Sequence, residues 1–347
     1  MAKVLILSEF GKEYPLAYRM AEEGESVTFQ TIAPCAGNGK EKENFKICSS
    51  TPKGLDPDLV IGASNGVGGI SDGYRKAGKV VLGGGALGDT LCRDREFLEK
   101  VVKFSKMLVP TVEEVIELKG TFLSLQIIGW FNGRQWIKPF QLAVKYNRFM
   151  EGDKGKDVNG MGSVLWGIEE GRLLTDTLLP LDVFLEKARY IGPVSVDVLV
   201  TTDSVYFIDF HTDLDQNWIY NLGELLKEKW FDFFHSLAVK TLSRIPMYKG
   251  KFSSMVKLSL PEHPGRDSAN CLAHVTKPEG ADHHIWLDGK DSFIGFTTAW
   301  GESPREAKRR VYRTVENMVL SPEVQYRRDI GETVELHINL LKGWGWI

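Results

Sequence analysis

The sequence has few cysteines and no long apolar run. Its 347 residues include four cysteines, which lie far apart and form neither a CxxC pair nor a zinc-ligand spacing. Its first residues match neither a signal peptide nor a membrane-spanning helix. These absences argue against a disulfide framework, a cysteine–zinc site and a membrane partner, so we expect a cytoplasmic protein with reduced thiols.

The sequence also lacks an excess of charge of either sign. It has 43 lysines and arginines against 46 aspartates and glutamates, and its formal net charge is -3. A charge this small excludes a global attraction to nucleic acid or to acidic membranes, although a local basic face remains possible. The hydrophobic share of 43% predicts a globular protein with a large core and two or three structural units.

What the chain does have is an unusual loop sequence. Residues 145–162 read KYNRFMEGDKGKDVNGMG, in which glycine and asparagine are mixed with lysine and aspartate. This composition lets the backbone turn sharply while it presents charges and free N–H groups, which is typical of a ligand-binding loop. A long surface connection without a ligand is the alternative.

Apolar runs and helix-like patterns alternate over the first hundred residues. We expect strands at 3–7, 59–62 and 80–83, and a helix that includes Leu16. This alternation predicts a parallel sheet, and the ligands of such sheets gather at the carboxyl ends of the strands. The residues expected to face a ligand there, unless their loops are purely structural, are Ser8, Gly11, Lys12, Ser64 and Asn65.

Three further elements follow from local patterns. Residues 87–107 are expected to form one long helix. The Asn-Gly pair at 132–133 predicts a hairpin turn, and the flanking Trp130 and Trp136 either stack on a ligand or pack on the core. Ser303 is expected to cap a helix that carries an apolar stripe and a basic face.

Alternating side chains over 194–211 predict a hairpin with one charged face. The four valines of 194–200 share a face with Tyr206, Ile208 and Phe210 if the pairing is even, for example with Val198 opposite Ile208, and this requires a three-residue loop. Cross-strand neighbours on the other face are then roughly 5 Å apart. Two carboxylates and an imidazole there suit a cation or an amine that needs a base, and a solvated face is the alternative. The residues of this face are Ser195, Asp197, Asp209 and His211.

Several of these stretches together resemble phosphoribosylamine-glycine ligase, an ATP-grasp enzyme that joins glycine to phosphoribosylamine. Residues 145–162 resemble its DHKR…GDGDxGPNTGGMG segment, 209–213 resemble the start of its EFNxRFGDPE strand, and 295–331 resemble its closing VTAxGETLEEAxxxAY…YRRDIG. The resemblance implies an α/β, ATP-grasp-like fold. The domains that it implies are a parallel-sheet domain at 1–110, a central domain at 111–250 and a C-terminal domain at 251–347.

The resemblance also implies that the small subdomain that clamps ATP is missing. In the family this subdomain follows a Pro-Thr pair, which is found here as Pro110-Thr111. Here residues 112–120 lead directly into an apolar strand at 122–128, and a segment this short cannot fold into several strands and a helix. We therefore do not expect ATP as a cofactor.

The resemblance assigns roles on the charged hairpin face. The magnesium-binding glutamate and asparagine of the family correspond to Asp209 and His211, and its substrate-binding arginine corresponds to Asp213. An imidazole prefers a softer divalent metal or acts as a base near neutral pH. We expect His211 to be a general base, oriented by Asp209 with Asp197 beside them, and a metal site at Asp209 and His211 is the alternative. The other implied substrate-binding residues are Lys145, Arg148, Asp153, Asp157, Asn159, Gly160, Met161 and Gly162.

Three functions remain as hypotheses. The first is a transferase that joins a glycine-like amino acid to an acceptor already activated by phosphate or pyrophosphate, such as a modified nucleotide or a DNA base of the kind some phages make. The second is an ATP-dependent carboxylate–amine ligase of purine synthesis whose clamp comes from another chain. The third is a non-catalytic protein that keeps a phosphoribosyl-type ligand. The first is preferred because phosphoryl transfer without a clamp loses positioning and charge neutralisation.

Overall fold

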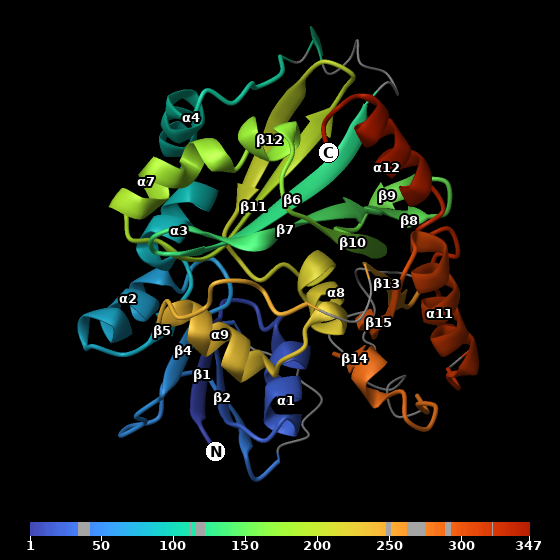
Figure 1. Ribbon diagram of the computed structural model, residues 1–347. Coiled ribbons are helices and arrows are strands. Elements are labelled where there is room, and N and C mark those ends of the chain that lie inside the picture. The colour runs from blue at the N-terminus through green and yellow to red at the C-terminus, as the bar shows by residue number, and fades with distance from the viewer. Residues whose placement is uncertain are drawn as a thin grey trace.

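Two sheets and the helices between and around them make up the structure. The computed structural model describes residues 1–33, 42–111, 113–114, 122–247, 251–261, 275–288, 293–320 and 322–347. Within these ranges, five strands form a parallel sheet, eight form an antiparallel sheet and two form a small hairpin. In Figure 1 the parallel sheet lies at the bottom, and the antiparallel sheet lies above it and to its right.

The expected parallel sheet is confirmed at the start of the chain. Its strand order is β3-β2-β1-β4-β5. The order reverses between β1 and β4, so the carboxyl ends of these two strands flank the switch point at which such sheets bind ligands. Helices α1 (Tyr14–Glu22) and α2 (Gly68–Lys76) follow these two strands. The strands are β1 (Lys3–Ser8), β2 (Ser26–Thr31), β3 (Phe45–Cys48), β4 (Leu59–Gly62) and β5 (Val81–Leu82).

The expected single helix at 87–107 is wrong, because the helix is interrupted at Asp94. Helix α3 (Gly85–Arg93) ends there and α4 (Arg95–Phe104) begins. Asp94 takes an extended conformation, and its side chain accepts a hydrogen bond from the N–H of Phe97 at 3.0 Å. This bond caps α4, which is why an aspartate starts a second helix rather than continuing the first.

The antiparallel sheet contains strands from the middle and from the last third of the chain. Its order is β12-β11-β6-β7-β10-β13-β15-β14. Since β10 pairs with β13, residues on both sides of position 250 contribute to one sheet. The strands are β6 (Leu123–Asn132), β7 (Trp136–Lys145), β10 (Gly162–Ile168), β11 (Ile191–Val200), β12 (Val205–His211), β13 (Phe252–Ser259), β14 (Ile285–Leu287) and β15 (Phe293–Gly301).

The hairpin expected around 132–133 is the turn between β6 and β7. Trp130 and Trp136 on either side of it are both buried. Trp130 packs edge-on against Trp218 with 5.6 Å between ring centroids, and Trp136 packs against Phe131 at 5.2 Å. Of the two alternatives for these tryptophans, the structure therefore shows the core role.

The register of the β11–β12 hairpin differs from the expected one. Val198 lies opposite Phe207 rather than Ile208, because the register shifts between Asp197 and Val198. Ile208 is the additional residue of this β-bulge and is 39% exposed. The connecting loop is 201–204, one residue longer than expected. Periodicity alone could not reveal the bulge, because an apolar residue occupies it.

Helices α8 (Gln216–Leu225) and α9 (Trp230–Ala238) pack between the two sheets. Their buried side chains share one core with the parallel sheet and with one face of the antiparallel sheet (Figure 1). Side chains from α4 and from the C-terminal helices cover the other face. The remaining helices are α6 (Arg172–Thr175), α7 (Asp182–Lys187), α11 (Pro304–Asn317) and α12 (Val334–Gly343). Along the described part of the chain, no helix combines the length and the apolarity needed to cross a membrane.

The expected cap of α11 is confirmed. The hydroxyl of Ser303 accepts a hydrogen bond from the N–H of Glu306 at 3.2 Å, and Pro304 is the first helical residue. The carboxylate of Glu306 in turn accepts from the N–H of Glu302 at 2.9 Å. These bonds satisfy backbone N–H groups at the start of the helix that have no partner within the helix.

Candidate functional site

The loop at 145–162 folds back on itself as a small hairpin. Strands β8 (Arg148–Met150) and β9 (Lys154–Asp157) pair with each other. The turn between them places Gly152 and Asp153 in the left-handed region, at φ values of 66° and 58°. Glycine adopts this conformation freely, whereas Asp153 is held in it by its surroundings.

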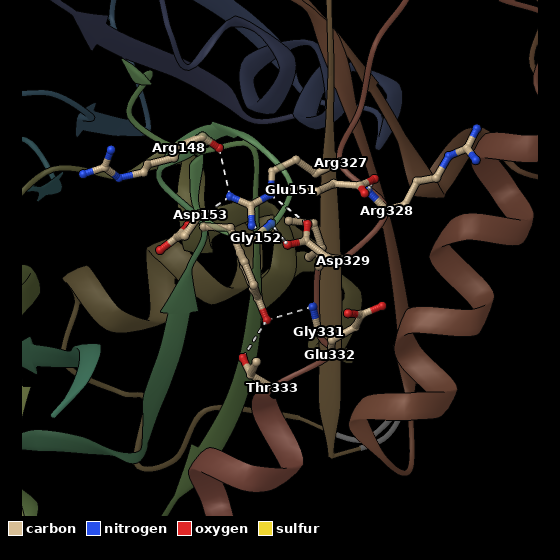
Figure 2. A network of polar contacts seen from close by, with 12 residues as sticks. Arg148, Glu151, Gly152, Asp153, Arg327, Arg328, Asp329, Gly331, Glu332 and Thr333 are labelled. Carbon is tan, nitrogen blue, oxygen red and sulfur yellow. Dashed lines mark hydrogen bonds and ion pairs between the residues drawn. The ribbon is translucent and has the colours of Figure 1, made fainter. Parts of the chain in front are cut away.

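Arg327, from the RRDIG sequence near the C-terminus, holds this hairpin in place. Figure 2 shows its guanidinium between the carbonyl of Arg148, at 2.9 Å, and the carboxylates of Asp153 and Asp329. The distances to Asp153 and Asp329 are 3.1 Å and 2.6 to 2.8 Å, and Asp329 also accepts from the N–H of Gly152 at 2.9 Å. Arg327 is only 2% exposed. The two stretches with the most specific sequences therefore bind each other.

Other polar residues of the loop bond within it. Arg148 donates to the carbonyl of Gly155 at 2.9 Å, and Asp157 accepts from the N–H of Asn159 at 2.8 Å. Asn159, like Asp153, has a left-handed backbone, at a φ of 57°. These contacts support the purely structural alternative for this loop.

Three residues at the end of the loop are packed tightly. A Cβ at Gly160 would overlap the side chain of Asn217, and a Cβ at Gly162 would lie 2.5 Å from the carbonyl oxygen of Met255. Met161 between them is 1% exposed. Close packing is thus sufficient to explain the two glycines here.

Three charged side chains meet on the antiparallel sheet, and we call them the Lys145 trio: Lys145, Asp197 and His211. The Nζ atom of Lys145 lies 2.8 and 2.7 Å from the two carboxylate oxygens of Asp197, and Nε2 of His211 lies 3.3 Å from one of them. Ser195 precedes Asp197 by two residues on β11, so the two side chains share a face of the sheet. Ser195 lies opposite Ile128 of β6, which belongs to the core shared by the two sheets. The trio therefore lies on the side of the parallel sheet.

The Lys145 trio keeps His211 charged at neutral pH. Burial lowers the pKa of His211, but its hydrogen bond to Asp197 and the charge of that carboxylate raise the pKa to about 8. Burial also acts to raise the pKa of Asp197, yet His211 and Lys145 bring it below its usual value. With two cations and one carboxylate, the trio has an excess of positive charge at neutral pH.

Asp209 does not orient His211, contrary to the sequence-based expectation. Oδ1 of Asp209 lies 3.4 Å from Arg95 at the exposed edge of the sheet, and the carboxylate that contacts His211 is Asp197. Residues two apart on one strand are about 6.6 Å from each other, so a partner on the next strand is nearer. Within the described ranges, no group of three His, Cys, Asp or Glu side chains is placed to hold a metal ion.

A second group of charges lies where the segment after β12 meets the turn after β1. We call it the junction cluster: Lys12, Glu13, Asp213, Asp215 and Lys257. Burial raises the pKa of Glu13 to about 7, against the effect of its hydrogen bond from Ser8. Burial and the charge of Asp215 raise the pKa of Asp213. Oδ1 of Asp213 is buried and has no hydrogen-bond partner in the described part of the chain.

The other candidates from the parallel sheet make connections inside the protein. Ser8 is buried and donates its hydroxyl hydrogen to Glu13. Ser64 accepts a hydrogen bond from a backbone N–H of the first loop at 2.6 Å. Asn65 accepts from the hydroxyl of Thr212 at 2.8 Å, which links the β4 loop to the segment after β12. Ser8 thus bonds a member of the junction cluster, and Asn65 bonds the residue that precedes Asp213.

Lys257 is a candidate that sequence reasoning missed. It lies in β13, is only 7% exposed, and faces the junction cluster. Burial and the nearby charge of Lys12 lower the pKa of Lys257 to about 8. The signal that could have revealed it is a single lysine inside the otherwise uncharged strand sequence FSSMVKLS.

Two cavities of the described surface are lined by residues outside both charged groups. One of about 520 Å³ lies against the β8–β9 hairpin and residues 324–328. Another, of about 410 Å³, is lined by residues that include Arg172 and Trp346. The Lys145 trio and the junction cluster are recognised here by their chemistry.

The two sheets and the charged residues between them define the fold class of the protein. A parallel-sheet domain stands against an antiparallel sheet, with charged residues where the two meet, and this is an α/β, ATP-grasp-like fold. No protein-family model and no curated protein sequence matches the chain.

Solved structures with a similar architecture include a ligase and the biotin carboxylase domains of carboxylases. Phosphoribosylamine–glycine ligase from Thermotoga maritima is similar with a TM-score of 0.70 and 16% identity, over 94% of this chain and 100% of that chain. The biotin carboxylase domain of a single-chain bacterial carboxylase is similar at 0.62 and 10%, over 99% of both chains. The biotin carboxylase domain of Hydrogenobacter thermophilus 2-oxoglutarate carboxylase is similar at 0.61 and 11%, over 98% of this chain and 94% of that chain. Identities this low establish the fold alone.

Proposed function

We propose that this chain forms a carbon–nitrogen bond between a glycine-like amino acid and an acceptor that already carries a phosphate or pyrophosphate leaving group. A modified nucleotide or a DNA base is the kind of acceptor that we envisage. The observation that carries the proposal is the Lys145 trio, in which an ammonium and an imidazolium are held by one carboxylate. In the ligase family that the sequence resembles, a metal ion supplies positive charge at this part of the sheet.

In the proposed reaction, the amine nitrogen attacks the acceptor carbon. The carbon–nitrogen bond forms as the carbon–oxygen bond to phosphate breaks. Lys145 and His211 stabilise the negative charge that develops on the departing phosphate. Asp213 takes the proton of the amine, because burial raises its pKa and its Oδ1 has no other hydrogen-bond partner among the described residues. This assigns His211 the role of a cation rather than of the base expected from the sequence.

The proposal includes no ATP site of the chain's own. Helix α4 ends at Phe104 and β6 begins at Leu123, so only residues 105–122 connect them. A clamp with several strands and a helix needs more chain than this. Residues 112 and 115–121, where the sequence predicted that the clamp is lost, lie outside the described residues.

A turnover assay tests the proposal. The purified chain is incubated with each standard amino acid and one of two acceptors: phosphoribosyl pyrophosphate, or a nucleotide whose base carries a pyrophosphorylated hydroxymethyl group. The expected result is pyrophosphate release that depends on the amino acid and not on ATP, with a carbon–nitrogen product identified by mass spectrometry. A product that forms only with ATP and magnesium would instead identify an ATP-dependent ligase. No product under either condition would leave a non-catalytic binding protein.

A matched pair of variants tests the role of the Lys145 trio in that assay. His211→Asn removes the imidazolium and is expected to lower turnover about 100-fold, the typical cost of one lost charge-stabilising group. His235→Asn changes a histidine of α9 that stacks on Phe231, and it is expected to leave turnover unchanged.

A further inference from the structure

The outward face of α11 carries three arginines, which we call the arginine row: Arg305, Arg309 and Arg313. They follow one another every four residues, so they share one face of the helix, opposite the buried Ala307 and Val311. All three are exposed. A step of four residues is about 6 Å along a helix axis, so the row extends over about 12 Å.

The other two cations of α11 are neutralised within the protein. Lys308 pairs with Glu332 at 2.7 Å, and Arg310 pairs with Glu306 at 2.8 Å. Within the described part of the chain, no ion pair involves the arginine row. The helical period places Glu316 on the same face at its C-terminal end, so three guanidinium groups stand against one carboxylate. The face therefore has an excess of positive charge.

The cavity of about 520 Å³ beside the β8–β9 hairpin has aromatic and cationic walls. Its size is that of a site for a small organic group. Two rings, one thioether and two unburied cations contribute to the lining: Phe149, Tyr326, Met150, Lys154 and Arg328.

The charges of this cavity are only partly compensated. Arg327 also lines it, but Asp153 and Asp329 accept hydrogen bonds from its guanidinium. Glu151, the carboxylate of the lining, accepts a hydrogen bond from the backbone N–H of Arg328 at 3.0 Å. Figure 2 shows the side chain of Arg328 directed away from this network. Its guanidinium thus adds to the positive charge outside the network.

The cavity and the arginine row adjoin each other. The hydroxyl of Tyr312 donates to the carbonyl of Arg327 at 2.7 Å, and the ring of Tyr312 lies 6.4 Å from that of Tyr326. Helix α11 and the hairpin lie on the same side of the molecule in Figure 1. Both tyrosines pack against the core on the face of the antiparallel sheet that is turned away from the parallel sheet. This surface is therefore separate from the junction cluster.

We infer that the arginine row and this cavity bind single-stranded DNA that carries the acceptor base. A chain of phosphodiesters requires cations that no carboxylate neutralises, and unpaired bases stack on aromatic rings and on guanidinium planes. A duplex keeps its bases stacked inside and cannot fill the cavity. The inference rests on the proposed function in one respect, because it selects a base in DNA rather than a free nucleotide as the acceptor.

A salt titration with a labelled oligonucleotide tests the arginine row. Fluorescence anisotropy measures the binding of the full chain to a single-stranded DNA of about 20 nucleotides, from about 50 to 200 mM salt. Arg305→Gln, Arg309→Gln and Arg313→Gln, combined in one chain, remove up to three phosphate contacts. The slope of log affinity against log salt is expected to decrease in magnitude by about 2, and the affinity at about 0.1 M salt to fall about 100-fold.

A second triple variant is the matched control for net charge. It replaces three exposed lysines of other elements by glutamine: Lys46, Lys76 and Lys103. Its net charge changes by the same amount, and it is expected to keep the parent's affinity and salt slope. Equal losses in the two triple variants, or no loss in the arginine variant, would overturn the inference.

Single substitutions test the cavity. Tyr326→Leu keeps an apolar side chain and removes the ring, so the affinity for DNA is expected to fall about 10-fold with an unchanged salt slope, because a stacked base is lost rather than a phosphate contact. Tyr206→Leu on β12 is the control and is expected to bind as the parent does. Thermal melts check that the variants fold. If Tyr326→Leu does not fold, Met150→Glu, at a side chain that is 57% exposed, is expected to weaken binding at least as much. Full affinity in the folded variant would overturn the inference.

Three further probes identify the partner. The same sequence as a duplex and as RNA is expected to bind more weakly than the single-stranded DNA, and tighter binding of either would overturn the inference. Vesicles that contain phosphatidylglycerol are expected not to bind. Vesicle binding that is lost in the arginine variant, without binding of DNA, would assign the surface to a membrane and overturn the inference.

The inference and the proposed function can fail separately. DNA binding without any carbon–nitrogen product would remove the proposed function and keep the DNA-binding surface. Turnover of the free nucleotide by a chain that does not bind DNA would keep the function and remove the surface.

Discussion

The β8–β9 hairpin and the junction cluster are both rich in charge but differ in how those charges are satisfied. At the hairpin, Arg327 is buried between Asp329, Asp153 and a backbone carbonyl. In the junction cluster, Oδ1 of Asp213 is buried and lacks a hydrogen-bond partner among the described residues, and burial lowers the pKa of Lys257 to about 8. A satisfied network rigidifies a fold, whereas unsatisfied buried groups lower stability and indicate a site for a ligand. The comparison teaches that the stretch most similar to a known family serves the architecture, while residues with less similarity are the better functional candidates.

Removing Arg327 is expected to have the largest effect on stability. Arg327→Ala leaves Asp329 without its partner and frees the hairpin from the C-terminal segment. The free energy of unfolding, measured with urea, is expected to fall by about 3 kcal/mol, as for other broken buried ion pairs. Arg328→Ala, which truncates the exposed neighbour, is the control and is expected to change stability by less than about 0.5 kcal/mol. Equal effects of the two substitutions would break the comparison, since the hairpin would then not depend on the buried pair.

Asp213→Asn is expected to lower turnover without lowering stability, in contrast to Arg327→Ala. The amide has nearly the shape of the carboxylate but cannot take a proton from an amine. We expect turnover to fall about 100-fold or more while the melting temperature is kept or raised, because a buried carboxylate with a raised pKa is removed. Steady-state rates and a thermal melt measure both quantities. A variant with full turnover and a lower melting temperature would show that Asp213 has a structural role, as Arg327 has at the β8–β9 hairpin.

The pH dependence of stability tests the Lys145 trio. The pKa of His211 is about 8 in the folded protein against 6.5 for an ordinary histidine, so the folded state holds the proton more tightly. The resulting stabilisation is complete below pH 6.5 and is lost as the pH rises through 8. From the difference between these values we expect a contribution of about 2 kcal/mol.

Urea unfolding at about pH 6 and about pH 9 measures this contribution. The parent is expected to lose about 2 kcal/mol more between the two conditions than His211→Asn does. Parallel losses in the two proteins would show that Asp197 does not hold the proton on His211.

Asp153→Ala is expected to have the smallest effect. The side chain is 70% exposed, and its pair with Arg327 is therefore worth less than about 1 kcal/mol. The turnover assay is expected to give the parent's value. A large loss of turnover without loss of stability would instead support the ligand role that the sequence suggested for this loop.

Prediction from sequence succeeded where a local pattern of residues specifies an element directly. The parallel sheet, the β6–β7 turn and the cap of α11 all follow from local chemistry at particular residues, such as Ser303. It failed where one residue changed the geometry. Asp94 divides a helix because its side chain caps the next one, and Ile208 shifts a register because it forms a bulge. Neither effect alters the hydrophobic pattern, so neither could be read from it.

By itself the sequence determined the α/β architecture and the charged face of the β11–β12 hairpin, because periodicity and side-chain alternation are local properties of the chain. Only the tertiary structure decided which charges meet. It brings Lys145 to Asp197 from another strand, Arg327 to a hairpin far away in the sequence, and Lys257 toward the turn that contains Lys12. Burial, which sets the cost of a charge and the pKa of each group, exists only after the sheets have packed against each other.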